Sequence, residues 1–390
     1  MRATKNSGFE WIGEIPTSWK LYKGKYMFTQ RNLRGNTIEL QLLSPTQKYG
    51  VVPQSVYEDR SGMNAVKLNE NANLSALKTI HKGDFCISLR SFQGGFEYSE
   101  YEGVVSPAYQ VFYPVVKVAR GYYKYLFKDS GFIEKMNSYT MTLRDGKNIA
   151  FADFGNTYIP CPSVDEQQRI ADFLDAKCVE IDALTADIQA QIDTLEQYKR
   201  SVITETVTKG LNPNAEMKDS GIQWVGQMPL AWEAVPNKYL MYKVKNICPV
   251  YNGEDILSLT TNGVIIRDLN GGGKMPTSFD GYQKVTPGNL LMCLFDIDVT
   301  PRCIGLVKNF GLTSPAYSQF VMRTGAYAPY YYYYYLMVDY TKELLHMAKN
   351  LRHSLTEDQL GAIKAPNPPY EEQVQIAEFL DKKCLEISRV

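Results

Sequence analysis

Residues 166–181 read EQQRIADFLDAKCVEI, and residues 372–387 read EQVQIAEFLDKKCLEI. Two stretches so similar within one chain indicate an internal duplication. Both are rich in residues that favour helix and contain neither proline nor glycine, a composition typical of a helix that continues for several turns. We therefore expect the same helix to occur twice in this protein.

A second motif is repeated ahead of each predicted helix. Residues 7–19 read SGFEWIGEIPTSW and residues 220–232 read SGIQWVGQMPLAW, and together they contain all four tryptophans of the chain. The motif SPAY also occurs twice, at 106–109 and 314–317. Between these anchors the two halves differ almost completely. Two recognition domains that share one scaffold but recognise different targets would produce this pattern. Duplication followed by ordinary sequence divergence would produce it as well.

The repeat predicts the fold class and the domain boundaries. We expect an α+β protein in which two similar mixed α/β domains are separated by long coiled-coil helices in a pseudo-twofold tandem repeat. The predicted parts are a first domain at 1–160, a long spacer helix at 161–213, a second domain at 214–366 and a second spacer helix at 367–390. The second helix is about half as long as the first, which predicts that it is truncated.

The long spacer helix carries a heptad pattern. Neither proline nor glycine occurs between residues 166 and 208, and about 43 residues at 1.5 Å each predict a rod of roughly 60 Å. Apolar residues recur along it with imperfect seven-residue spacing, so we expect a coiled-coil seam shared with the second helix. The predicted seam positions are Ile170, Leu174, Ile181, Leu184, Ile188, Leu195, Val202, Ile376, Leu380 and Ile387.

Composition places the chain among globular cytoplasmic proteins. No apolar run approaches the roughly 20 residues that span a bilayer, and the first residues lack the apolar stretch of a signal peptide. The seven cysteines are scattered without a Cys-x-x-Cys pair, and the three histidines are not spaced as a metal pair. We expect reduced thiols, no metal, no membrane and a cytoplasmic location.

The net charge of zero conceals a segregation of charge along the chain. Residues 1–160 carry 20 Lys/Arg against 14 Asp/Glu, and residues 214–366 carry 14 against 13. The spacer segments are acidic, with 5 against 10 at 161–213 and 3 against 5 at 367–390. A polyanion responds to local potential, so DNA binding by the two large domains remains possible. The acidic faces of the two helices are either ordinary solvent-exposed surface or a docking surface for another subunit.

Each large domain contains a tyrosine-rich helical candidate, near 119–137 and 328–349. Six consecutive tyrosines at 330–335 resemble a platform for stacking bases. On a helix, however, six consecutive side chains point in all directions, so we expect most of these rings to pack in the interior.

One motif suggests an enzyme. Asn367-Pro368-Pro369-Tyr370 matches the tetrad with which amino-methyltransferases hold a target adenine. The corresponding stretch of the first half is Pro160-Cys161-Pro162-Ser163, so the prolines fit a segment leading into the helix. No glycine-rich strand-turn-helix for S-adenosylmethionine precedes the tetrad. We therefore expect no catalytic residues, and keep a stand-alone adenine methyltransferase as the enzymatic alternative.

Polar and basic clusters occur at matching places in both halves. Arginine can bridge two acceptors on guanine, asparagine can pair with adenine, and lysine and serine suit phosphates. The alternative is that these are solvent-exposed loop residues with no role in binding. The residues that we predict to contact DNA are Arg90, Phe92, Gln93, Arg144, Lys147, Asn148, Arg302, Arg352, His353 and Ser354.

With both repeated motifs in place, the chain resembles the specificity subunit of type I restriction-modification systems (the HsdS family) over essentially its whole length. The resemblance implies two target-recognition domains, each reading half of an asymmetric bipartite site in double-stranded DNA. It further implies helices that separate the half-sites and dock two methyltransferase subunits.

The same resemblance implies what the partners contribute. The methyltransferase subunits would bind S-adenosylmethionine, and motor-nuclease subunits would use ATP and magnesium, so this chain would be a non-catalytic, DNA-binding subunit without a cofactor of its own. A coiled-coil adaptor that only assembles other proteins is the second alternative.

Overall fold

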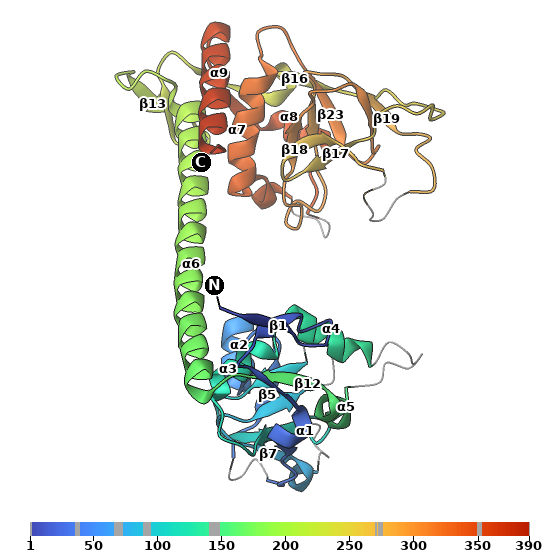
Figure 1. Ribbon diagram of the computed structural model, residues 1–390. Helices are drawn as coiled ribbons and strands as arrows, with labels where there is room; N and C mark the ends of the chain where they lie inside the picture. The colour runs from blue at the N-terminus through green and yellow to red at the C-terminus, as the bar shows by residue number, and fades with distance from the viewer. Residues whose placement is uncertain are drawn as a thin grey trace. The chain divides into compact units, whose positions relative to one another are not determined.

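The computed structural model describes residues 2–35, 40–65, 73–88, 95–139, 149–269, 271, 276–348 and 353–389. The chain divides into two compact units, Met1–Ala186 and Asp187–Val390 (Figure 1). The division lies within one helix, α6 (Val164–Lys209), which contributes to both units.

The first unit is built on a four-stranded antiparallel sheet in the order β4-β11-β8-β9. Its strands are β4 (Phe28–Gln30), β11 (Gln110–Pro114), β8 (Phe85–Ile87) and β9 (Phe96–Tyr98). Four antiparallel pairs surround it: β1 (Thr4–Asn6) with β2 (Glu14–Pro16), β3 (Lys20–Lys23) with β12 (Tyr158–Cys161), β5 (Leu43–Thr46) with β6 (Gly50–Pro53), and β7 (Lys78–Ile80) with β10 (Gly103–Val105). The helices are α1 (Gly24–Met27), α2 (Gln54–Ser61), η1 (Leu74–Ala76), α3 (Arg120–Leu126), α4 (Ser130–Ser138) and α5 (Phe151–Asn156).

The second unit repeats this topology pair for pair. Its four-stranded sheet has the order β16-β23-β20-β21, with β16 (Met241–Val244), β23 (Ser318–Met322), β20 (Leu290–Met292) and β21 (Ile304–Leu306). The surrounding pairs are β13 (Met217–Asp219) with β14 (Gln227–Pro229), β15 (Glu233–Pro236) with β24 (Lys364–Asn367), β17 (Leu257–Thr260) with β18 (Gly263–Ile266), and β19 (Gln283–Val285) with β22 (Gly311–Thr313). The helices are η3 (Asn237–Tyr239), α7 (Ala328–Tyr340), η4 (Glu343–Met347), α8 (Glu357–Ala362) and α9 (Tyr370–Ile387). The predicted tandem repeat and α+β class are confirmed.

The two cores are filled with different aromatic residues. In the first unit, Phe28 lies at the centre of a phenylalanine cluster with ring centroids 5.2–5.9 Å from its neighbours. In the second unit, the tyrosines of α7 fill the core, and Tyr330, Tyr331 and Tyr334 are fully buried. Their hydroxyls are satisfied inside the protein; that of Tyr330, for example, donates to the Val207 carbonyl at 3.0 Å. The tyrosine run therefore packs, as expected, and is not a stacking platform.

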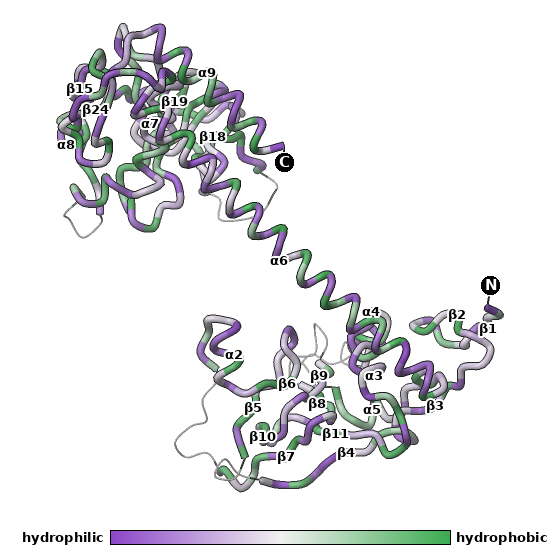
Figure 2. Tube along the Cα trace, turned by 90° about the vertical axis from the view of Figure 1, so that its left-hand side faces the viewer, coloured by the Kyte–Doolittle hydropathy of each residue, from purple (hydrophilic) through white to green (hydrophobic). Residues whose placement is uncertain are grey.

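Helix α6 begins and ends at residues that suit helix termini. Asp165 and Glu166 lie in its first turn, where the helix dipole favours negative charge. Gly210 follows its last residue with a φ of +74°, a left-handed conformation that glycine adopts without strain. Forty-six residues make a helix of about 69 Å. Hydrophobic and hydrophilic positions alternate along its trace (Figure 2).

Both tyrosine-rich helical candidates are shorter than the sequence predicted. The candidate near 119–137 is divided into α3 and α4, because the Asp129 side chain accepts a hydrogen bond from the Phe132 N–H and starts a new helix. The candidate near 328–349 stops at Tyr340 and continues only as η4, after Lys342 adopts a φ of +54°. Within the residues described here, no helix has the length and apolar character that crossing a membrane requires.

Candidate nucleic-acid interface

Most of the residues predicted to contact DNA lie outside the described ranges. These are Arg90, Phe92, Gln93, Arg144, Lys147, Asn148 and Arg352. The described candidates, Arg302, His353 and Ser354, all belong to the second unit. The geometry of the candidate interface is therefore built from the connection between β20 and β21, residues 293–303, which we name the β20–β21 loop.

The second unit brings two predicted segments together. The N–H of Ile297, in the β20–β21 loop, donates to the His353 carbonyl at 3.3 Å, and the Leu355 N–H donates to the Leu294 carbonyl at 2.8 Å. His353 Nδ1 also lies 2.9 Å from Asp298 Oδ2. This hydrogen bond from His353 is the main cause that lowers the pKa of Asp298. Segments about 55 residues apart in the sequence thus meet at one end of the four-stranded sheet.

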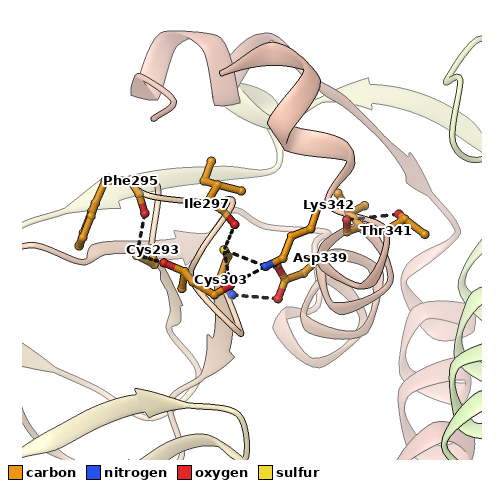
Figure 3. A network of polar contacts seen from close by, with 9 residues as sticks. Cys293, Phe295, Ile297, Cys303, Asp339, Thr341 and Lys342 are labelled. Carbon is orange, nitrogen blue, oxygen red and sulfur yellow. Dashed lines mark hydrogen bonds and ion pairs between the residues drawn. The ribbon is translucent and has the colours of Figure 1, made fainter. Parts of the chain in front are cut away.

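A buried carboxylate fixes the base of the β20–β21 loop (Figure 3). Asp339, near the end of α7, accepts the Cys303 N–H at 2.8 Å through Oδ2. The Lys342 ammonium donates to the other oxygen of Asp339 at 2.7 Å and to the Thr300 carbonyl at 2.6 Å. Because Asp339 is 8% exposed, the ion pair and the backbone contact are both shielded from water. This loop is held at its base by α7.

The two cysteines of this network are neutral structural thiols. Burial raises the pKa of Cys303 to about 12 and raises that of Cys293, and a protonated buried thiol is unreactive. Cys293 and Cys303 face each other across the first residue pair of the loop, where the Cys293 N–H donates to the Cys303 carbonyl at 2.8 Å. Their role is to fill space beside Asp339.

The sequence analysis did not predict Asp339 and Lys342. One signal was available: Asp339 is the single charged residue in helix α7, which otherwise reads as alanine, proline, tyrosine and apolar residues. A lone carboxylate on a helix that is apolar all round must find a partner when the helix is buried. The partners themselves, a backbone N–H and a lysine beyond the helix end, depend on tertiary contacts.

Arg302 lies in the β20–β21 loop itself, two residues before β21. Its side chain lines a cavity together with Tyr332 and Tyr340 of α7 and the β17–β18 turn. His353 and Ser354, by contrast, lie beside the β20–β21 loop at its other end. The described candidates of the second unit therefore lie in one loop or beside it.

A buried glutamine makes two equivalent hydrogen bonds at the start of each spacer helix. Gln167 and Gln373 are both fully buried. Gln167 accepts the Ala119 N–H at 2.9 Å and donates to the Pro162 carbonyl at 2.9 Å. Gln373 accepts the Tyr327 N–H at 2.8 Å and donates to the Pro368 carbonyl at 2.8 Å. Each glutamine thus joins the spacer helix to the segment preceding the tyrosine-rich helix.

The hydrogen bonds at the start of α9 also involve Asn367, the residue whose side chain would bind adenine in a methyltransferase tetrad. The Asn367 side-chain oxygen accepts the Tyr331 hydroxyl at 2.8 Å and the Gln373 amide at 3.2 Å. Tyr370 is 47% exposed and packs edge-on against Tyr327. Because the acceptor oxygen of Asn367 already has two donors within the protein, the tetrad has a structural role at the start of α9.

The predicted seam positions lie in three environments. Ile170 packs against the first core, and Val202, Ile376 and Leu380 belong to the second core or pack against it. Leu174, Leu195 and Ile387 are half-buried. The positions between are exposed: Ile181 and Leu184 by 59% and Ile188 by 48%. Among the described residues, no cluster of His, Cys, Asp and Glu suits a metal ion.

Comparison with known proteins finds a family model that matches the first part of the chain. Residues 18–194 match the model described as the type I restriction modification DNA specificity domain. The specificity subunit of the type I restriction enzyme MjaVIII of Methanocaldococcus jannaschii is 26% identical over an alignment of 278 residues, and the match covers 65% of this chain. The chain covers 62% of that protein's length.

Two solved structures share the fold over nearly the whole chain. The HsdS subunit from Thermoanaerobacter tengcongensis is 15% identical, with a TM-score of 0.54, and the likeness covers 98% of this chain and 92% of that one. A chain from a study of complex assembly and conformational transition of the type I R-M system is also 15% identical, with a TM-score of 0.68 and coverages of 96% and 92%. Residues 18–194 thus match a type I restriction modification DNA specificity domain, and the chain is similar to specificity subunits of type I restriction-modification systems.

Proposed function

We propose that this chain reads a bipartite, asymmetric site in double-stranded DNA, with one half-site for each unit. The observation that supports this most strongly is one framework used twice with different loops. Both units have the same sheet order and the same buried glutamine, whereas the segments at the end of the sheet differ in sequence. Identical frameworks with different loops suit two readers of different base sequences.

We further propose that α6 and α9 dock two methyltransferase subunits, and that motor-nuclease subunits join the same complex. In this arrangement S-adenosylmethionine, ATP and magnesium bind to the partners, and the chain itself is non-catalytic and works on DNA in the cytoplasm. Two observations support the proposal. The central part of α6 carries exposed apolar side chains, and the Asn367 oxygen is committed to internal hydrogen bonds.

The function is tested by mapping methylated adenines across the genome of cells that express this chain with its neighbouring methyltransferase subunit. We expect methylation at a single two-part sequence with a fixed gap, and none when the chain is omitted. A methyltransferase that shows the same sites without the chain, or no site-specific methylation with it, would contradict the proposal.

A double substitution separates DNA reading from assembly. Arg144→Ala with Arg352→Ala removes two predicted contacts that occupy the same relative position in both halves. We expect the affinity for the target DNA to fall while binding to the methyltransferase subunit is unchanged. If DNA affinity is unchanged as well, the chain acts as an assembly adaptor.

A further inference from the structure

A cavity of about 230 Å³ lies inside the second unit, between the helices and a β-turn. Helices α6, α7 and α9 and the turn between β17 and β18 all contribute to its wall. Its polar lining consists of Lys199, Thr261, Asn262, Arg302, Tyr332 and Tyr340, with further apolar atoms from neighbouring residues. Of the three predicted DNA contacts that the structure describes, Arg302 lines this wall, and His353 and Ser354 do not.

Several polar groups in this cavity lack partners. The Arg302 guanidinium and the hydroxyls of Tyr332 and Tyr340 make no hydrogen bond or ion pair with any residue in the described ranges. The Lys199 ammonium has one long contact, 3.4 Å to the Ser388 hydroxyl. The hydroxyls of the other tyrosines on α7 form hydrogen bonds within the protein. Tyr332 and Tyr340 differ from them in that both line this cavity.

The charges around the cavity do not balance. Lys199 and Arg302 line it, and Arg200 stacks on the Tyr340 ring with its guanidinium carbon 5.0 Å from the ring centroid. Among the described residues that line this cavity, none carries a carboxylate. The acid next to it, Asp381, accepts the Tyr333 hydroxyl at 2.7 Å and lines an adjoining cavity with Lys308. Burial raises the pKa of Tyr332 and that of Tyr340, so both hydroxyls stay protonated donors.

Cations and neutral hydroxyl donors that converge without an acid favour an anion with several acceptor oxygens. A half-buried guanidinium in particular suits a phosphate, because its donors form a planar fork. We propose that this cavity is a phosphate-binding site, in which Arg302 and Lys199 hold the charge and Tyr332 and Tyr340 donate hydrogen bonds. Because Arg302 lies in the β20–β21 loop, the phosphate belongs to the backbone of the DNA that binds at this loop.

This site rests on the proposed function for the identity of its ligand, and it positions the DNA instead of reading its sequence. Phosphate contacts fix register and orientation but carry no base information. Substitution of Arg302 therefore lowers the affinity for specific and non-specific DNA equally. Substitution of a residue that contacts base edges would instead lower the affinity for the specific site alone.

The experiment measures the affinity of the full chain for DNA at a series of salt concentrations. Each lost phosphate contact lowers the slope of log K against log salt by about 0.9, which corresponds to about a tenfold loss of affinity at 0.1 M salt. We expect this loss for Arg302→Gln and for Lys199→Gln, equally on target and random duplexes. Arg302→Lys, which keeps the charge, should retain the slope.

Matched controls separate the site from general charge and from misfolding. Lys382→Gln removes an exposed cation of α9 outside the cavity and should leave the slope unchanged. Tyr340→Phe removes one hydroxyl without changing charge and should lower the affinity while the salt slope stays the same. A thermal unfolding curve of each variant verifies that the second unit is folded.

A second arm distinguishes DNA from free phosphate. Inorganic phosphate is added to the full chain at constant ionic strength, and the melting temperature is recorded for wild type and Arg302→Gln. A rise that depends on Arg302, combined with an unchanged DNA salt slope, assigns the site to free phosphate. No effect of Arg302 in either arm overturns the proposed site. If wild type shows no preference for any DNA sequence while the Arg302 effect persists, the proposed function fails and the phosphate site stands.

Discussion

The two units attach the central sheet to the neighbouring helix with a carboxylate that lies on the strand in one unit and on the helix in the other. In each, a buried carboxylate and a lysine join the central sheet hairpin to the neighbouring helix. In the first unit the carboxylate is on the strand: Glu97 of β9 accepts from Lys128, which follows α3, at 2.6 Å. In the second it is on the helix: Asp339 of α7 binds Lys342 and the backbone of the hairpin. The attachment is common to both units, and the residues that make it are not.

At the start of the spacer helix, by contrast, the two units use the same residue type for the same contacts. Gln167 and Gln373 occupy the same position and make the same two types of hydrogen bond within 0.1 Å. Trp19 and Trp232 also meet Tyr122 and Tyr330 edge-on at 6.4 and 6.5 Å. The framework is therefore fixed where the helix begins, and variable at the end of the sheet where the candidate interface lies.

Among the substitutions proposed here, loss of the buried Asp339 carboxylate in the second unit should have the largest effect on stability. Asp339→Ala leaves the buried Cys303 N–H without an acceptor and Lys342 without its counter-charge, and breaking such a pair costs about 4 kcal/mol. We expect faster hydrogen exchange in residues 293–306, measured by mass spectrometry, with the first unit unchanged. Asp339→Asn keeps an acceptor for the Cys303 N–H and should cost less. Equal exchange in Asp339→Ala and wild type would show that α7 does not hold the loop.

The corresponding pair in the first unit should respond to pH. Burial raises the pKa of Glu97 to about 7 against the opposing effect of Lys128, from an ordinary value of 4.5. The folded state then binds a proton that the unfolded state releases, so stability falls as pH rises from about 4.5 to 7, by about 3 kcal/mol in all.

Glu97→Gln removes this titration. We expect the difference in unfolding free energy between pH 5 and pH 8 to shrink in the variant, as measured by denaturant unfolding of the full chain. Glu134→Gln, at an exposed carboxyl of α4, is the matched control and should behave as wild type. An identical pH dependence in wild type and Glu97→Gln would remove Glu97 as its source.

The smallest effect tests the part that the units share. Gln167→Ala and Gln373→Ala each leave a backbone N–H and a carbonyl without partners, at a cost of about 2 kcal/mol. We expect both variants to be destabilised in chemical denaturation, and Gln373→Ala somewhat more, because the Gln373 amide also donates to the Gly325 carbonyl at 3.0 Å and to Asn367 Oδ1 at 3.2 Å. A substitution that is silent in one unit and costly in the other would show that the two helix starts are not equivalent.

Much of the fold could be predicted because it depends on local and repeated patterns. The absence of proline and glycine between residues 166 and 208 predicted α6 to within two residues at either end. Repeated motifs predicted two like units, and six adjacent tyrosines predicted packing because no helix can turn them all to one surface. The predicted domain bounds and seam positions stay predictions.

Other features depend on contacts that are distant in the sequence. The division of the first tyrosine-rich candidate required recognition of Asp129 as a helix cap, and helix α2 has no counterpart among the described residues of the second unit. The hydrogen bonds that join Asp339 and Lys342 to the β20–β21 loop, and the cavity around Arg302, arise where strands, α7 and α6 meet. Pairing across about 40 residues leaves no periodic signal, so residue type alone does not reveal it.

The most direct test of two equivalent readers is a chain that contains the same reader twice. Residues 24–162 replace residues 237–368, so that the first interior stands between the second unit's own motif and its own helix. Methylated adenines are then mapped in cells that also express the methyltransferase subunit. We predict a palindromic target made of two copies of the half-site that the first unit reads. An unchanged asymmetric target would contradict the account.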